Sequence, residues 1–198
     1  MKVHSFALTP REKDKIWIKN QLDTFYFREA NIIKTIPYHI SLMVCSLSPL
    51  AKKNLLKFLK ENSLSLPLIS AQVDNFKPLG NEYIMLSIKS PELLETHLKI
   101  LEAVRPFTAG NFNSKYLKQN LSSKEIDYLY KYGYHRVKDL FKIHLTAGKY
   151  LTSEIRDQEL EAAPKIKGKL TFDTLQLVEV EDGANTQGKI LWQTKLGN

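Results

Sequence analysis

The chain has 198 residues, which is long enough to bury a substantial core in one compact domain or two small lobes. Its 43% hydrophobic and 25% charged residues exclude a disordered protein, no apolar run is long enough to cross a bilayer, and the start MKVHSFALTPREK is unlike a secretory signal, so we expect a cytoplasmic protein. The net charge of +8 favours anionic partners such as phosphates or nucleic acid, and Cys45, the only cysteine, rules out an internal disulfide and a thiolate zinc cluster.

Four helices are predicted, over residues 10–27, 49–61, 91–104 and 123–132. Three of them begin with a hydroxyl residue followed by proline, a combination that caps a helix and presets its first residue: Thr9, Ser48 and Ser90. Two starts also fit a capping box, Thr9 with Glu12 and Ser122 with Glu125, and Gly133 closes the last helix. In the third helix a core-facing stripe is predicted from leucines at helical spacing: Leu94, Leu98 and Leu101.

Short apolar or alternating runs around these helices predict seven strands: VHSFAL, YHISLMV, LISAQVDNF, YIMLSIK, FKIHLTAGKYL, LTFDTLQLVEV and KILWQTKL. Turn residues around Gly80 and Gly183 predict hairpins between neighbouring strands. Residues 106–121 are the least patterned part of the chain, and we interpret them as a connection between two lobes.

The predicted strands form an internal repeat. PYHISLM, SAQVDNFKPL and EYIMLSIK in the first half correspond to FKIHLTAG, TFDTLQLVEV and GKILWQTKL in the second. If Ile84 and Ile190 are equivalent points in the closing strands, their distances from the histidine of the opening strand are 84 − 39 = 45 and 190 − 144 = 46 residues. The two halves therefore look like copies of one unit.

Each unit opens with the same four residue types, namely histidine, apolar, hydroxyl and apolar. The first motif is His39-Ile40-Ser41-Leu42, and the second motif is His144-Leu145-Thr146-Ala147. Side chains alternate along a strand, so the histidine and the hydroxyl of each motif share one face while the apolar residues pack on the other. A pseudo-twofold pairing of the two units would bring both histidines into one groove.

Such a groove supports phosphodiester cleavage without a metal ion. Histidine has an ordinary pKa of about 6.5, so at neutral pH one imidazole can take a proton from an attacking water while the other, protonated, gives one to the leaving oxygen. The hydroxyls of Ser41 and Thr146 can donate hydrogen bonds to the non-bridging phosphate oxygens.

The paired motifs resemble those of the two-histidine phosphoesterase superfamily, which includes 2'-5' RNA ligase-like proteins and cyclic nucleotide phosphodiesterases. The stretch LSSKEIDYLYKYGYHRVKDLFKIHLTAGKY is similar to a bacterial branch often encoded beside phosphonate-utilisation genes. The resemblance implies an α+β fold with two pseudo-symmetric lobes of antiparallel sheet, outer helices and a central groove. The approximate lobes are residues 30–105 and 121–198, with residues 1–29 packing on them. The resemblance also implies catalytic roles for His39 and His144 and phosphate contacts from Ser41 and Thr146, although Ser41 stands where threonine is commoner.

Three residues near the second motif are further candidates for substrate binding. Lys142 shares the predicted face of His144, where it would either neutralise phosphate charge or remain a solvated lysine. Tyr134 would stack on a base, bond a phosphate or pack in the core, and Arg136 has the fork that binds a second phosphate.

We predict from these features a metal-independent phosphodiesterase that opens a 2',3'-cyclic phosphate on RNA or a nucleotide. The alternatives are cleavage of a 2'-5' phosphodiester or a sugar cyclic phosphate, a catalytically idle module that binds RNA or a nucleotide, and a structural protein. No cofactor or metal is predicted, because the sequence has neither a phosphate-cradling glycine loop nor a metal-ligand cluster. We expect a monomer without an obligate protein partner, with specificity set by loops 107–118 and after Gly148.

Overall fold

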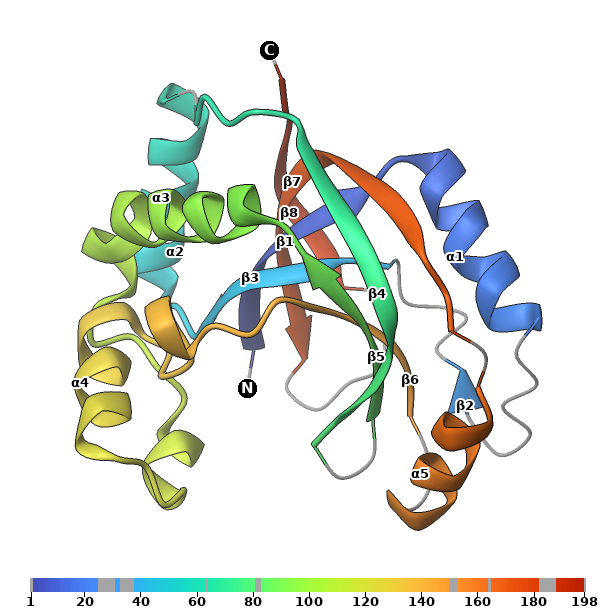
Figure 1. Cartoon of the computed structure of the whole chain (residues 1–198). Helices are drawn as coiled ribbons and strands as arrows, with labels where there is room; N and C mark the ends of the chain where they lie inside the picture. The colour runs from blue at the N-terminus through green and yellow to red at the C-terminus, as the bar shows by residue number, and fades with distance from the viewer. Residues whose placement is uncertain are drawn as a thin grey trace.

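The computed structural model describes residues 2–24, 31–32, 38–62, 64–80, 83–149, 153–163, 165–181 and 188–197. In chain order its elements are β1 (Lys2–Pro10), α1 (Glu12–Thr24), β2 (Asn31–Ile32), β3 (Ile40–Cys45), α2 (Pro49–Glu61), β4 (Ile69–Leu79), β5 (Tyr83–Lys89), α3 (Pro91–Thr108), η1 (Ser114–Lys118), α4 (Ser123–Tyr132), η2 (Lys138–Leu140), β6 (His144–Lys149), α5 (Ser153–Ala162), β7 (Gly168–Glu181) and β8 (Lys189–Lys195). The predicted α+β class is confirmed (Figure 1). No helix that the structure describes is long and apolar enough to cross a membrane.

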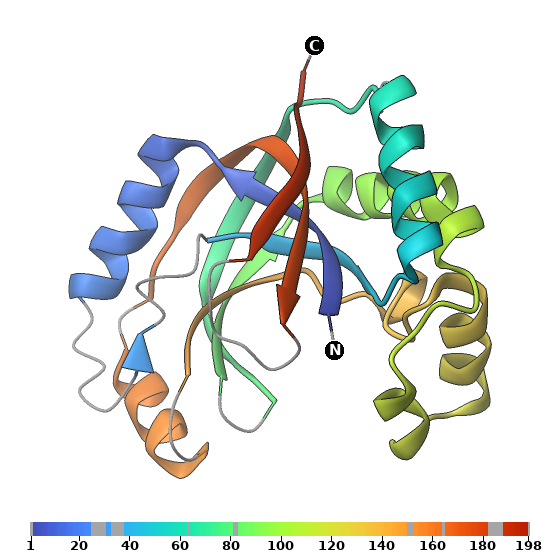
Figure 2. The same ribbon diagram turned by 180° about the vertical axis from the view of Figure 1, so that it is seen from behind.

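One curled antiparallel sheet organises the fold. Its strand order is β2-β6-β5-β4-β7-β1-β3, and β8 also pairs with β7. The long strand β7 joins the two halves, because its first residues pair with β4 and its remaining length pairs with β1 and β8. The sheet arches over its width, with α2, α3 and α4 gathered at one end and α1 and α5 at the other (Figures 1 and 2).

The strand order corrects one part of the predicted repeat. In the first half of the sheet, β5 lies between β4 and the second motif strand, β6. In the other half, the strand between β7 and the first motif strand, β3, is β1 and not β8. The predicted equivalence of Ile84 on β5 and Ile190 on β8 is therefore wrong, and β1 occupies the place that corresponds to β5.

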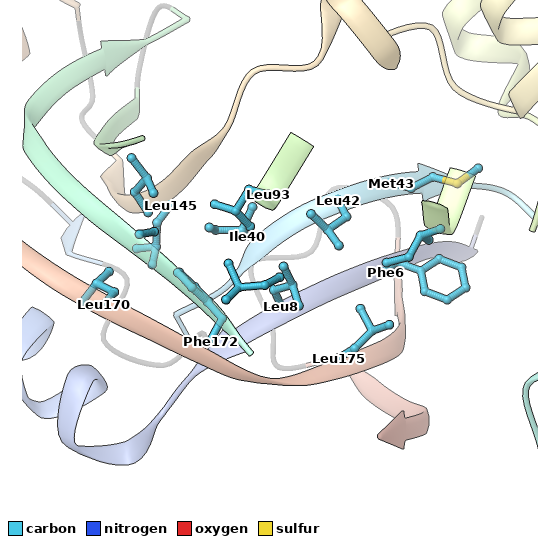
Figure 3. Packing of buried hydrophobic residues seen from close by; sticks show 14 of the residues in the cluster. Phe6, Leu8, Ile40, Leu42, Met43, Leu93, Leu145, Leu170, Phe172 and Leu175 are labelled. Carbon is cyan, nitrogen blue, oxygen red and sulfur yellow. The ribbon is translucent and has the colours of Figure 1, made fainter. Parts of the chain in front are cut away.

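The core lies between the sheet and the helices that pack on it. Ile40, Leu42 and Leu145, the apolar residues of the two motifs, belong to one buried cluster with Leu93 of α3 (Figure 3). Burying side chains of this size contributes about 1.5–3 kcal/mol each. The same cluster therefore anchors both motif strands through their apolar side chains.

The helix boundaries follow the predicted capping signals at two places. Ser48 Oγ accepts a hydrogen bond from the Ala51 backbone N–H at 3.2 Å. Ser122 and Glu125 form the complete capping box of α4, and Gly133 ends that helix with a left-handed φ of 78°. These signals depend only on nearby residues, which is why the sequence predicts them well.

The two other starts differ from the prediction: Thr9 is not a cap, whereas Ser90 is the N-cap residue of α3 with Pro91 after it, as predicted, but makes no capping bond with its hydroxyl. β1 continues to Pro10, and Thr9 Oγ1 donates to the Thr174 carbonyl at 3.5 Å instead of capping α1. Ser90 precedes α3, but its hydroxyl donates to the Glu92 carboxylate at 2.6 Å and makes no bond to the helix backbone.

The extents of the helices also differ from the prediction. α3 runs on to Thr108 through Pro106, and its buried apolar residues are Leu93, Ile100, Leu101 and Val104, whereas Leu94 and Leu98 are exposed. The prediction of a core-facing Leu94 and Leu98 is therefore wrong, and only Leu101 is confirmed. The helix α5 has no counterpart among the four predicted helices. Residues 25–27 and the Gly183 turn lie outside the described residues.

Candidate active site

The two motif strands come from distant places in the strand order and meet where the sheet curls. β3 is the last strand at one end, and β6 is the second strand from the other end. Their ladder partners are β1 and β5, yet β3 and β6 also pack against each other (Figure 1). The curl therefore brings the two motifs together across the concave side of the sheet.

Both motif strands carry a β-bulge at the same motif position. The ladder between β1 and β3 skips Leu42, and the ladder between β5 and β6 skips Ala147. Each skipped residue is the fourth of its motif and directly follows the hydroxyl residue, Ser41 or Thr146. Bulges bend a strand and re-aim its side chains, and they are over-represented beside active sites. The two motifs are thus equivalent in backbone geometry as well as in residue type.

The motif residues alternate in burial along both strands. Ile40, Leu42 and Leu145 are buried, and the polar residues are half-buried: His39, Ser41, His144 and Thr146. This confirms the predicted division into a core face and a polar face. The strand itself is shorter than predicted, because β6 begins at His144 and residues 141–143 precede it as irregular chain.

A pocket of ≈ 190 Å³ joins the two motif strands to the segment between α4 and β6. Its polar lining residues are Ser41, Tyr134, Arg136, Lys142 and His144. Its apolar lining residues are Leu42, Val44, Leu79 and Phe141. The hydroxyl of the first motif and the histidine of the second motif therefore share one cavity.

Four of the six predicted site residues line this pocket: Ser41, Tyr134, Lys142 and His144. His39 and Thr146 do not line it among the described residues. His39, directly before β3, and Thr146, on β6, each lie two positions from a lining residue, which corresponds to about 7 Å in extended chain. The sequence marks Arg136 only as a candidate phosphate contact, and the four apolar walls carry no recognisable signal in the sequence.

The imidazole of His144 has a defined orientation. Its Nδ1 lies 2.7 Å from the carbonyl oxygen of Lys142. A carbonyl can only accept, so Nδ1 carries the proton of this bond and Nε2 is left as the nitrogen that can take or give a proton. The backbone of Lys142 thus fixes which nitrogen of His144 remains available to a ligand.

The hydroxyl of Ser41 is held from the neighbouring strand. Ser5 Oγ on β1 donates to Ser41 Oγ at 3.3 Å. Since Ser41 accepts this bond, its own O–H can donate to a ligand in the pocket. An acceptor-rich ligand such as a phosphate suits that arrangement.

The pocket carries positive charge without a carboxylate among its described lining residues. Arg136 and Lys142 are both exposed at its wall. Asp139, the nearest acid in the same segment, is engaged by Tyr128 Oη at 2.7 Å and by Lys124. An anion in the pocket would therefore meet two cations and no competing acid.

Tyr134 presents a neutral phenol to the pocket. Burial raises the pKa of Tyr134 above its ordinary value, and the nearby positive charge of Arg136 only partly opposes this. Its ring meets Tyr116 edge-on, at 5.8 Å between centroids, and the buried His135 at a tilt, at 5.1 Å. Tyr134 is therefore a fixed hydrogen-bond donor or stacking surface.

Among the described residues, no group of three or more histidine, cysteine or acidic side chains could hold a metal ion.

Solved structures with the same fold are known at low sequence identity. TT0787 of Thermus thermophilus is 13% identical with a TM-score of 0.63, and the match covers 98% of this chain and 97% of that one. E. coli LigT, solved in complex with 3'-AMP, is 14% identical with a TM-score of 0.62, covering 100% and 99%. A crystal structure described as a phosphoesterase is 12% identical with a TM-score of 0.57, covering 100% of both chains.

No protein-family model and no curated protein matches the sequence. The structural matches therefore confirm the resemblance at the level of the fold, over the whole chain. The proposed link to the phosphonate branch stays a prediction.

Proposed function

We propose that the chain is a metal-independent phosphodiesterase that opens a 2',3'-cyclic phosphate, on an RNA end or a nucleotide, to a monoester. The observation that carries this proposal is the pocket in which Ser41 of the first motif, His144 of the second motif and the cations Arg136 and Lys142 meet. Support also comes from E. coli LigT, which has this fold and was solved with 3'-AMP. Adenosine 3'-monophosphate is the product that remains when a 2',3'-cyclic phosphate opens at its P–O2' bond.

The reaction needs one base and one acid on opposite sides of the phosphorus. Water attacks the phosphorus and gives its proton to one imidazole, while the other imidazole protonates the ribose oxygen as the P–O bond breaks. His144 acts through Nε2, since its Nδ1 is bonded to the Lys142 carbonyl. His39 takes the complementary role from the position directly before β3, two residues from Ser41. The products are a ribose hydroxyl and a phosphate monoester, so atoms and protons balance.

The remaining polar groups would stabilise the charge that builds on the phosphate. Ser41 and Thr146 donate hydrogen bonds to its non-bridging oxygens, each from the bulged region of its strand. Arg136 and Lys142 neutralise the phosphate and the additional charge of a nucleotide or RNA chain. Tyr134 donates a further bond or stacks on the base.

The test is a turnover assay with a metal chelator present throughout. The substrates are an RNA oligonucleotide ending in a 2',3'-cyclic phosphate, a 2'-5' linked dinucleotide and a sugar cyclic phosphate. We expect cleavage of the first substrate, and losses of about a hundredfold or more in His39→Ala and in His144→Ala, because each removes one of the two proton-transfer groups.

Gln193→Ala supplies the matched control, because Gln193 is an exposed polar residue on β8 and does not line the pocket. It should retain the wild-type rate. Activity that requires an added divalent cation, or a His144→Ala rate within a few fold of wild type, would overturn the proposal. Tight binding of the cyclic phosphate without turnover by any variant would instead favour the idle binding module.

A further inference from the structure

His97, a histidine outside both motifs, links the two sides of the candidate active site. It lies on α3 and is 1% exposed. Its Nδ1 is 2.8 Å from the carbonyl oxygen of Leu42, and its Nε2 is 2.9 Å from the backbone nitrogen of Lys138. The carbonyl can only accept and the amide can only donate, so the ring is neutral, with its proton on Nδ1. Both nitrogens of this imidazole are therefore used.

The first partner is the bulge of the first motif. Leu42 is the residue that the ladder between β1 and β3 skips, and it lines the pocket beside Ser41. A bulge takes a residue out of the regular hydrogen-bond ladder, and a buried carbonyl without a partner is costly. His97 supplies a donor to this carbonyl, so it stabilises the bulge that aims Ser41.

The second partner opens the segment that leads to the second motif. Lys138 has a φ of 55°, and it is the only described non-glycine residue in the left-handed region. Such a conformation costs an L-residue energy and persists where the surrounding structure holds it. The bond from the Lys138 N–H to His97 holds this turn. Six residues later the same segment reaches His144, and on the way it supplies the carbonyl of Lys142 that orients the His144 ring.

A third contact joins the ring to the pocket wall. His97 stacks on Phe141, with 4.0 Å between the ring centroids and an interplanar angle of 9°. Phe141 lines the pocket, as do Arg136 and Lys142. The imidazole thus contacts two lining residues, Leu42 through a backbone bond and Phe141 through its ring, and it also bonds the backbone of Lys138.

We propose that His97 is a positioning residue of the candidate active site, which sets the first-motif bulge against the segment that carries the second-motif histidine. This inference rests on the proposed phosphodiesterase function. A purely structural role would require only that the space be filled. The imidazole does more, because it bonds the backbone of residues 42 and 138, which lie 96 positions apart in the chain. Leu42 lines the pocket, and Lys138 lies in the segment that supplies its lining residues Arg136, Phe141 and Lys142.

Three substitutions separate the two bonds from the packing. His97→Asn keeps a polar group near the position of Nδ1, so it can still donate to Leu42. His97→Gln keeps one near Nε2, so it can still accept from Lys138. His97→Phe retains the ring volume and the stack on Phe141 but makes neither bond. Ile100→Ala is the control, because Ile100 is buried one turn along the same helix and does not line the pocket.

The readouts are kcat and KM for the cyclic-phosphate RNA, together with the affinity for inorganic phosphate by calorimetry, well below the melting temperature of every variant. For His97→Phe we expect kcat to fall by about a hundredfold, since a misplacement of about 1 Å has that effect, with a smaller change in KM. His97→Asn and His97→Gln should each have a higher kcat than His97→Phe, because each keeps one of the two bonds. Ile100→Ala should lose thermal stability but keep kcat within a few fold of wild type.

Equal losses of kcat in His97→Phe and Ile100→Ala, or a wild-type kcat in folded His97→Phe, would overturn the positioning role. If the wild-type protein cleaves none of the substrates, the proposed function fails separately. The positioning role then stands or falls on phosphate binding: we expect roughly tenfold weaker binding in His97→Phe than in Ile100→Ala, and equal affinities would refute it.

Discussion

Acid should destabilise the folded chain through His97. Burial lowers the pKa of His97 from 6.5 to about 4, and the bond to the Leu42 carbonyl opposes this only in part. Between pH 6.5 and about pH 4, His97 is protonated in the unfolded chain but stays neutral in the folded chain. The free energy of unfolding is therefore highest above pH 6.5 and falls as the pH is lowered through the folded pKa.

The size of this loss follows from the shift in pKa. One pKa unit corresponds to about 1.4 kcal/mol of free energy. Relative to pH 7.5, the protonation of His97 should therefore lower the free energy of unfolding by about 2 kcal/mol at pH 5 and by about 3 kcal/mol below pH 4. No reduction for solvent screening applies, because the side chain is 1% exposed.

Urea unfolding of wild type and His97→Phe at pH 7.5 and pH 5 measures this contribution, with Trp17 and Trp192 as fluorescent reporters. Phenylalanine cannot take up a proton, so the variant should lose about 2 kcal/mol less than wild type over this interval. Burial also lowers the pKa of His4 and of His135, but both titrate in the two proteins and cancel in the difference. Parallel pH dependences would refute the assignment of a neutral, buried His97.

Two further substitutions test other parts of the fold. Glu179→Gln should lower the free energy of unfolding by about 2 kcal/mol at pH 7, because bonds from Lys52 and Lys2 hold the pKa of this buried carboxyl at about 2. Both lysines are partly solvated, which reduces the loss from the value that the pKa shift alone would give. In urea titrations this cost should shrink as the pH falls from 4.5 towards 2, and a constant difference would contradict it. Gly133→Ala should lower the melting temperature more than Gly80→Ala. Both have a positive φ, but only at Gly133 would the new Cβ lie 2.6 Å from a backbone oxygen; equal losses would contradict this.

The parts of the fold that depend on neighbouring residues could be predicted from the sequence. The capping box at Ser122, the left-handed Gly133 and the alternating burial of both motifs all depend on residues within a few positions. Thr9 failed as a cap because β1 pairs with β7 as far as Pro10, and that pairing joins residues more than 160 positions apart. A capping signal depends on neighbouring residues only, so it does not show that a distant strand will pair with the same residue.

The candidate site shows the same division. Ser41 and His144 belong to motifs that can be recognised by residue type and spacing, and the structure places both in one pocket. Phe141 and Leu79 are ordinary apolar residues in the sequence, and only the tertiary fold makes them pocket walls. His97 carries no motif at all, because its role comes from backbone groups at residues 42 and 138 that a sequence pattern does not contain.

The bulges show where the internal symmetry of the fold resides. The first motif strand pairs with β1, which precedes it in the chain, whereas the second pairs with β5, which belongs to the other half of the sequence. The two units therefore do not repeat as uninterrupted stretches of chain, and this is why equating β5 with β8 failed. What repeats is a strand pair in which the ladder skips the residue after the hydroxyl. A bulge increases the local twist of its strand, so two equivalent bulges turn the two polar faces by similar amounts. The curl of the sheet then brings the two motif strands into contact, so that Ser41 of the first motif and His144 of the second motif line one pocket.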